Sequence, residues 1–271
     1  MSAPAPIGLI GIDVDGTLVG SSPEVAPRIW EAAARARAAG IHLVLCSGRP
    51  AFGLTLDYAS RLDPDGWHVF QNGASIVHMK TRESLSVSLP IAAVEQLIAA
   101  ARSTQRVLEL YSDTEYVTES SSPWAREHAE LLGVPFEPRP YDALRGAVVR
   151  GQWLVPVADT EAVTKAAPDG LEIAQSSSPL MPDTRFVGLT RAGVSKGSAI
   201  RTVAQKYGVA LASVMYVGDS GNDLSALEIV GCPVAMANAD AAVIAVARHV
   251  APHVDDAGAA EAIELAMTIG R

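Results

Sequence analysis

The chain has 271 residues, of which 49% are hydrophobic and 19% are charged, and its formal net charge is -9. This composition is typical of a folded globular protein and excludes a disordered or collagen-like chain. The acidic balance also argues against a nucleic-acid-binding protein, because phosphate backbones are bound by clustered cations. The length allows one large domain or two interleaved domains.

Cysteine usage and hydropathy favour a cytoplasmic protein. Cys46 and Cys232 have no second cysteine or histidine at zinc-ligand spacing, so we expect two buried thiols. The N-terminal segment lacks the basic flank and the apolar stretch of a secretory signal. The longest apolar tract, 234–251, is interrupted by polar residues and does not predict a membrane span. We expect a monomer or homodimer that binds no membrane.

The first 75 residues follow a strand, helix, strand rhythm. Residues 7–12 form a short, almost continuous apolar run, which is typical of a strand buried on both faces of a parallel sheet. Further buried strands are predicted at 41–46 and 67–71, and helices at 27–39 and 51–62. This alternation predicts one half of a doubly wound α/β sheet.

The middle of the chain has a different pattern. Polar and apolar residues alternate as in antiparallel strands, and the strands are separated by amphipathic helices. The predicted strands lie within 75–89, 107–118, 147–157, 171–174 and 185–190, and the predicted helices at 91–103, 124–132 and 161–167. This α+β pattern predicts an inserted domain.

After Gly193 the α/β rhythm returns, with predicted helices at 196–207 and 257–267 and strands at 214–217 and 234–236. The predicted fold is therefore α/β, with a doubly wound, mostly parallel, Rossmann-like sheet and an inserted α+β cap domain. We place the catalytic core at 1–79 and 192–271, and the cap, which we expect to select the substrate, at 80–191.

Polar residues follow several predicted strands or open a helix. They are Asp13, Asp15 and Thr17; Ser47, Gly48 and Arg49; Lys196; and Asp219, Asn222 and Asp223. The carboxyl ends of parallel strands share one edge of the sheet, so we expect these clusters to converge. Phosphoryl transfer needs a nucleophile, a metal, donors for the phosphoryl oxygens and a proton source. The combined set supplies all four.

Carboxylate oxygens beside a phosphate favour Mg2+, which takes one or two protein carboxylates and keeps several waters. Asp13 and Asp219 are the candidate ligands. Asn222 and Asp223 would lie around them and orient Lys196 or a metal-bound water.

These motifs resemble the four motifs of the haloacid dehalogenase-like hydrolase superfamily. The first, DxDGT, is 13–17; the second is Ser47; the third is Lys196; and the fourth, GDxxND, is 218–223. The resemblance implies that Asp13 is the nucleophile and forms an aspartyl-phosphate, and that Asp15 is the general acid and base. It also implies that Ser47 and Lys196 hold the phosphoryl group. The implied metal ligands are Asp13, the Asp15 carbonyl and Asp219.

The spacing of the motifs is similar to that of Cof-type members with a type IIB cap. Only the segment between Ser47 and Lys196 is long enough to contain a lid domain. One departure follows the fourth motif, where many Cof-type members have Met-Leu and this chain has Ser225, Ala226 and Leu227. The resemblance implies a Mg2+-dependent phosphatase that acts on a sugar phosphate or a related small phosphomonoester.

Thr17, Gly48, Arg49, Asn72 and Gly73 are the candidate substrate-binding residues. Arg49 could instead form a surface ion pair, and Asn72-Gly73 could be a simple hairpin turn. In the cap, the candidates by residue type are Tyr111, Trp124, Arg139, Arg150 and Arg185.

Two other functions use similar residues. A phosphomutase would return the phosphoryl group to a bound intermediate. A phosphate-sensing module similar to a receiver domain would keep it, although receiver domains place the acidic pair before the acceptor aspartate.

Overall fold

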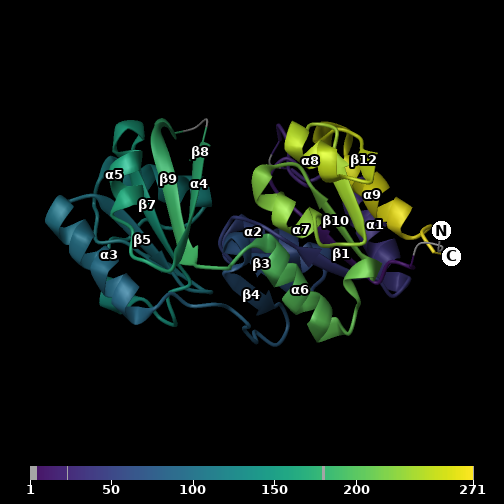
Figure 1. Cartoon of the computed structure of the whole chain (residues 1–271), viewed down its shortest axis with the longest axis horizontal. Helices are drawn as coiled ribbons and strands as arrows, with labels where there is room; N and C mark the ends of the chain where they lie inside the picture. The colour runs from purple at the N-terminus through teal and green to yellow at the C-terminus, as the bar shows by residue number, and fades with distance from the viewer. Residues whose placement is uncertain (1–4, 23, 179–180, 271) are drawn as a thin grey trace. The chain divides into compact units, whose positions relative to one another are not determined.

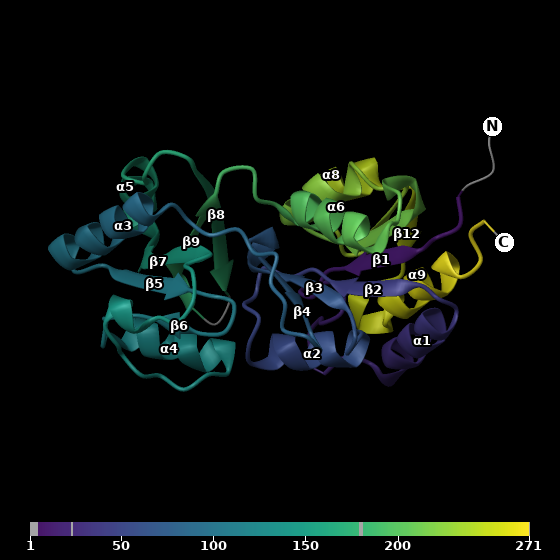
Figure 2. The same cartoon turned by 90° about the horizontal axis from the view of Figure 1, so that it is seen from below.

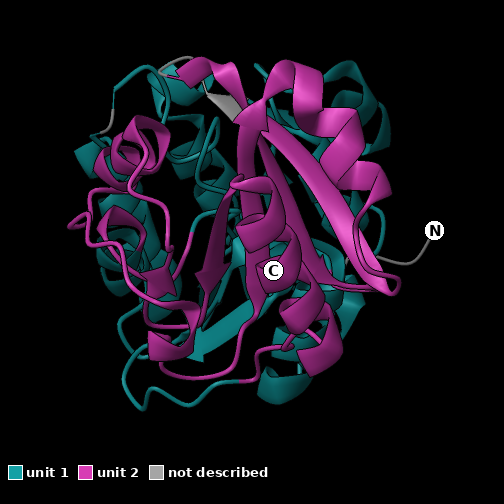
Figure 3. Ribbon diagram, turned by 90° about the vertical axis from the view of Figure 1, so that its left-hand side faces the viewer, with its two compact units in different colours: residues 1–49, 56–84, 195–271 teal, residues 50–55, 85–194 magenta. Residues whose placement is uncertain are grey.

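The computed structural model describes residues 5–22, 24–178 and 181–270 (Figure 1). The chain folds into two compact units (Figure 3). Unit 1 contains residues 1–49, 56–84 and 195–271, and unit 2 contains residues 50–55 and 85–194. Each unit has its own sheet.

Unit 1 is built on a five-stranded sheet with the order β12-β11-β10-β1-β2, in which every neighbouring pair is parallel. Its strands are β1 (Leu9–Ile12), β2 (His42–Leu45), β10 (Val214–Gly218), β11 (Cys232–Met236) and β12 (His249–Ala251). Ile12 of β1 lies opposite Leu45 of β2 and Val217 of β10, so these three strands end at the same level. The predicted doubly wound α/β fold is confirmed.

Helices cover both faces of this sheet. They are α1 (Pro27–Ala38), α2 (Leu54–Leu62), α6 (Lys196–Tyr207), α7 (Leu224–Leu227), α8 (Ala241–Val246) and α9 (Gly258–Ala266). Figure 2 shows α1 and α9 on one face and α6 and α8 on the other. Both α1 and α9 bury several alanines, whose small side chains let the two helices approach closely. No helix in the described part of the chain combines the length and apolar character that a bilayer span requires.

The predicted third strand is present, but it is not paired along its length with the parallel sheet. β3 (Trp67–Phe70) pairs with β4 (Ser75–His78) in an antiparallel hairpin and meets the segment after β2 at a single bridge, Cys46 with Val69. One cause is His68, whose Nδ1 accepts the Leu45 N–H at 2.9 Å. Burial lowers the pKa of His68 to about 4, so the neutral imidazole can accept this bond.

Unit 2 contains a five-stranded antiparallel sheet with the order β6-β5-β7-β9-β8. Its strands are β5 (Val107–Tyr111), β6 (Tyr116–Val117), β7 (Arg150–Pro156), β8 (Leu171–Ser178) and β9 (Met181–Arg191). Its helices are α3 (Ile91–Thr104), α4 (Pro123–Leu132) and α5 (Thr160–Lys165). Residues of α3 and α5 pack with one set of alternate strand side chains, and α4 packs with the other set.

Short 3-10 helices complete the secondary structure. They are η1 (Gln71–Gly73), η2 (Tyr141–Ala143), η3 (Val157–Asp159), η4 (Leu211–Ser213), η5 (Gly221–Asp223) and η6 (Val254–Asp256).

Candidate active site

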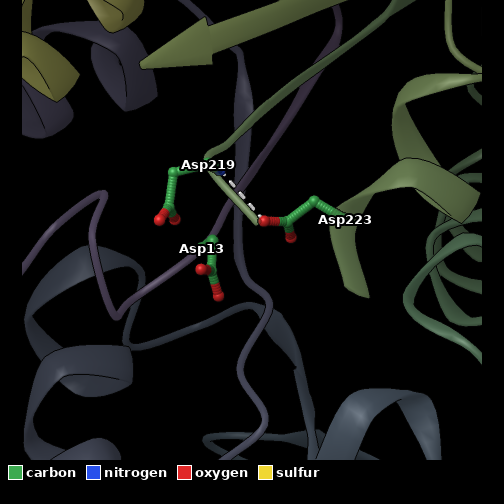
Figure 4. Close-up of side chains that lie close together, drawn as sticks. All are labelled: Asp13, Asp219 and Asp223. Carbon is green, nitrogen blue, oxygen red and sulfur yellow. Dashed lines mark hydrogen bonds between the residues drawn. The ribbon is translucent and has the colours of Figure 1, made fainter. Parts of the chain in front are cut away.

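Three carboxylates from distant parts of the sequence meet at the carboxyl edge of the unit 1 sheet. Asp13 directly follows β1, and Asp219 directly follows β10. The Asp13 N–H donates to the Val217 carbonyl at 3.0 Å, which brings these two strand ends side by side. Asp13, Asp219 and Asp223 each offer an oxygen, and these oxygens all lie within 4.8 Å of one another (Figure 4). The predicted convergence of the first and fourth motifs is therefore present.

Lys196 lies between two of these carboxylates. Its Nζ donates to Asp13 Oδ1 at 2.6 Å and to Asp223 Oδ1 at 2.7 Å, and the residue is 1% exposed. Burial alone lowers the pKa of Lys196, but the two carboxylates outweigh burial and raise it. The lysine is therefore a buried ammonium ion.

The first turn of α6 fixes the position of this lysine. Lys196 is the first residue of the helix, after the N-cap Ser195, and Ser195 and Ser198 form a reciprocal capping box. A cation is unfavourable at a helix N-terminus, so Lys196 does not help α6 to form. Its position brings the ammonium to the carboxylates instead.

Asp223 accepts four hydrogen bonds. Oδ1 accepts from Lys196 Nζ and from the Tyr216 hydroxyl, both at 2.7 Å. Oδ2 accepts from the backbone N–H groups of Asp219 at 3.1 Å and Ser220 at 3.2 Å. The oxygens of this carboxylate are thus occupied by groups of the protein, and Oδ1 holds the ammonium of Lys196.

Tyr216 is a residue of the site that sequence reasoning missed. It lies within the apolar strand β10, is completely buried, and donates to Asp223. A buried phenol needs a hydrogen-bond partner, so a tyrosine near the carboxyl end of a buried strand was the available signal.

The cluster contains more carboxylates than cations, and this excess shifts the pKa of two aspartates. Burial and the nearby Asp223 raise the pKa of Asp13 well above its ordinary value, although Lys196 opposes this. Burial and Asp223 also raise the pKa of Asp219 to about 6. Three carboxylates share one ammonium, which favours retention of a proton or binding of a cation.

The turn after Asp13 requires a glycine. Gly16 has φ +82°, and a Cβ on it would lie 2.1 Å from Asp219 Oδ2, so a side chain would collide with the carboxylate. The next residue, Thr17, is completely buried and donates its hydroxyl to Asp219 Oδ1 at 3.1 Å. Contact of Thr17 with substrate stays a prediction, and in the structure its hydroxyl orients a candidate metal ligand.

Asp15 is exposed and forms a two-point ion pair with Arg49. Arg49 Nε donates to Asp15 Oδ2 at 3.0 Å, and Nη2 donates to Oδ1 at 2.5 Å. Ser47 is completely buried, and its Oγ accepts from the Arg49 N–H at 3.0 Å. Arg49 thus forms an ion pair with Asp15, the predicted general acid.

The hairpin turn after β3 lies beside these residues. Asn72 has φ +55°, its N–H donates to the Ser47 carbonyl at 3.0 Å, and its Oδ1 accepts from Asn222 Nδ2 at 3.0 Å. Gly48 lies against the Asn72 amide. Gly73 has φ +102°, and a Cβ on it would lie 2.2 Å from the Ser195 carbonyl oxygen. Asn72 and Gly73 therefore form a hairpin turn and also adjoin the site, and the side chain of Asn222 bonds to Asn72 and Ser220.

The residues of this site lie in a region that matches known proteins. A family model described as haloacid dehalogenase-like hydrolase matches residues 10–263. The provisionally named phosphatase YxeH of Bacillus subtilis is 28% identical over 262 residues, which cover 94% of this chain and 96% of that protein.

Solved structures are similar over nearly the whole chain. A haloacid dehalogenase-like hydrolase from Bacteroides thetaiotaomicron superposes with a TM-score of 0.82 and is 28% identical, covering 96% of this chain and 99% of that one. The subclass IIB sugar phosphatase BT4131 has a TM-score of 0.76 and 22% identity over 95% of this chain and 98% of that one. This second likeness shows the fold, including its α+β second unit.

Proposed function

Because the chain belongs to the haloacid dehalogenase-like hydrolase family, we propose that it hydrolyses small phosphomonoesters with Mg2+ through an aspartyl-phosphate intermediate. Its family and the phosphatase names of its relatives make it a phosphatase. The observation that carries the finer proposal is the meeting of Asp13, Asp219 and Lys196 at one sheet edge.

In the first chemical step, Asp13 attacks the phosphorus atom while the bond to the leaving oxygen breaks. Lys196 binds Oδ1 of Asp13, which leaves Oδ2 as the attacking oxygen. Asp15 donates a proton to the leaving oxygen, so that an alcohol departs. We assign the Ser47 hydroxyl and Lys196 to the phosphoryl oxygens.

In the second step, Asp15 takes a proton from a water molecule, which attacks phosphorus and releases inorganic phosphate from Asp13. Arg49 pairs with the carboxylate form of Asp15, so this pair must open before Asp15 can carry a proton. A substrate phosphate dianion is a suitable competitor for the Arg49 guanidinium, since it offers the same two-point geometry.

The donor set of the site fits Mg2+, because carboxylate oxygens are hard ligands and the three carboxylates are accompanied by one ammonium group. Asp13, the Asp15 backbone carbonyl and Asp219 would hold the ion, which when bound offsets the charge on the phosphoryl oxygens. Thr17 keeps Asp219 in orientation through its hydroxyl. Asp223, which already accepts four hydrogen bonds, orients Lys196.

Magnesium is expected to stabilise the protein, and more strongly above pH 6 than below it. At a free concentration of one hundred times Kd, the gain in unfolding free energy is about 2.7 kcal/mol. The raised pKa of Asp219 means that the folded protein holds a proton below about pH 6, and Mg2+ must displace this proton. Thermal unfolding with and without MgCl2 at pH 7.5 and pH 5.0 measures the effect.

The Asp219→Asn variant is the control for this experiment. It should unfold cooperatively and lose the magnesium-dependent rise in Tm at pH 7.5. A rise in Tm at pH 5.0 as large as that at pH 7.5 would contradict the assignment of Asp219 as a ligand.

We propose that unit 2, which overlaps most of the predicted cap at 80–191, selects the substrate. Among its candidate residues, the Arg150 guanidinium lies 5.6 Å from the ring centre of Tyr111. Arg139 forms an ion pair with Glu115 at 2.9 Å, and Trp124 packs on a small apolar cluster. Arg150 also donates to Gln152, and the buried Tyr111 donates its hydroxyl to Glu109, so each of these four side chains is engaged within unit 2 and each is varied in turn in a test of selectivity. The cytoplasmic location and the monomeric or homodimeric state stay predictions.

A screen of phosphorylated metabolites tests the proposed function. The panel begins with sugar phosphates, the class for which the subclass IIB neighbour is named, and adds other small phosphomonoesters. We expect inorganic phosphate to be released in the presence of MgCl2 and not in the presence of EDTA. Formation of an isomeric phosphate without release of inorganic phosphate would favour a phosphomutase and contradict the proposal.

A further inference from the structure

The side chain of Asn238 connects the turn after β1 to the chain after β12. Asn238 Nδ2 donates to the Gly16 carbonyl oxygen at 2.8 Å, and its Oδ1 accepts from the Val254 N–H at 3.0 Å. A backbone N–H can only donate and a carbonyl oxygen can only accept, so these two partners determine which way the amide points. Asn238 touches none of the carboxylates of the active site in the described hydrogen bonds.

Asn238 binds the carbonyl of Gly16, the residue of the active-site turn with the greatest backbone freedom. Glycine samples more backbone conformations than any other residue, and Gly16 adopts φ +82°. Its N–H donates to the Val19 carbonyl at 2.8 Å, while its C=O accepts from Asn238. The peptide planes on both sides of Gly16 are thus held, and so is the direction in which Asp15 leaves the turn.

The segment that bears Asn238 is itself held in place. The Ala237 N–H donates to the Ala251 carbonyl at 2.9 Å, and the Asp240 N–H donates to the Asp219 carbonyl at 2.8 Å. The amide of Asn238 therefore extends from a fixed support.

The turn that contains Val254 also contacts Ser21, which follows the active-site turn in the sequence. Asp255, the neighbour of Val254, accepts from the N–H of Ser21 at 2.8 Å and from its hydroxyl at 3.0 Å. Asn238 thus binds this segment at Gly16, directly after Asp15, whereas Asp255 binds it at Ser21. Asp255 offers a matched control.

We propose that Asn238 is a positioning residue for the general acid Asp15. This inference rests on the proposed function, in which Asp15 protonates the leaving oxygen. Without the bond from Asn238, the peptide group between Gly16 and Thr17 is held by the longer bond from the Thr17 N–H to the Val14 carbonyl at 3.3 Å, so the turn is looser and Asp15 spends less time at the leaving group. The loss must then be larger for esters whose leaving group needs a proton than for esters whose leaving group departs as a stable anion.

Two single-ring esters separate these cases. The leaving group of benzyl phosphate is a strongly basic alkoxide unless it is protonated. The leaving group of p-nitrophenyl phosphate is a weakly basic phenolate. The value of kcat/KM reports steps up to departure of the leaving group, so the shared hydrolysis of the phosphoenzyme does not enter. The test compares kcat/KM for both esters, with MgCl2, in the wild type and in Asn238→Asp, together with Tm.

Asn238→Asp keeps the size of the side chain and the acceptor for Val254, but it places a carboxylate oxygen against the Gly16 carbonyl. We expect kcat/KM for benzyl phosphate to fall by about 100-fold, and the ratio of the two esters to change by at least about tenfold. Any effect of the new charge that is common to both esters cancels in the ratio.

Asn238→Ala is the second variant, because it removes the amide without adding charge, and the same change in ratio is expected. Asp255→Ala removes the neighbouring contact to Ser21 and should lower Tm without changing the ratio. An unchanged ratio in either folded Asn238 variant would overturn the inference and leave the proposed function intact. The proposed function fails separately, if the wild type releases no inorganic phosphate from any phosphorylated metabolite of the screen described above.

Discussion

Asp13→Asn is expected to lower phosphate release by more than about 10⁴-fold while the protein stays folded, because an amide cannot serve as the nucleophile. Asp13 follows β1 at the sheet edge and contributes no apolar packing. Steady-state phosphate release in MgCl2 measures the loss. A variant that kept more than about 1% of wild-type turnover would contradict the assignment of the nucleophile.

The same substitution should not destabilise the metal-free protein at neutral pH. Burial and Asp223 raise the pKa of Asp13 in the folded state, so the wild type loses stability as the pH rises from the ordinary pKa of an aspartate up to this raised pKa. Asparagine does not ionise, and its advantage over the wild type should be present at high pH and vanish at low pH. Urea unfolding across pH measures this difference. Asp65→Asn is a matched control, since Asp65 is an exposed carboxylate of the same unit paired with Lys80.

Lys196→Met is expected to lower the unfolding free energy of the metal-free protein by about 3 to 5 kcal/mol, because it leaves two buried carboxylates without their cation. Phosphatase activity should also fall, since the carboxylate of Asp13 loses the hydrogen bond from Lys196 that fixes its orientation. Urea unfolding in EDTA gives the stability, and phosphate release in MgCl2 gives the activity.

The double variant Lys196→Met with Asp223→Asn separates these two effects. Removing the second carboxylate should restore part of the lost stability without restoring turnover, because the coupling is electrostatic and the lysine is still absent. The four unfolding free energies form a cycle that measures the Lys196–Asp223 coupling. A single Lys196 variant as stable as the wild type would show that the buried ion pairs contribute nothing.

Sequence patterns predicted most of unit 1 because its strands are buried on both faces and read as continuous apolar runs. The predicted strands at 7–12, 41–46 and 214–217 correspond to β1, β2 and β10. The elements α8 and β12 were missed, since six and three residues are too few to show a period. The parallel strand order then follows from right-handed crossovers, which bring the motif residues to one edge.

The residues of the site were predictable where a charged side chain interrupts an apolar run, as Asp13 and Asp219 do. Tyr216 was missed because it lies inside such a run and looks like a packing residue. Asn238 was missed for a different reason. Its partners are the backbone groups of Gly16 and Val254. Because almost every residue has the same backbone groups, a sequence does not indicate which of them a side chain binds.

The position of β1 between β2 and β10 has a consequence for synthesis of the chain. β1 and β2 leave the ribosome early, but β10 is translated only after all of unit 2. Unit 2 is almost continuous in sequence and can begin to fold while β1 still has one open edge. Asp13 and Lys196 therefore meet only near the end of translation.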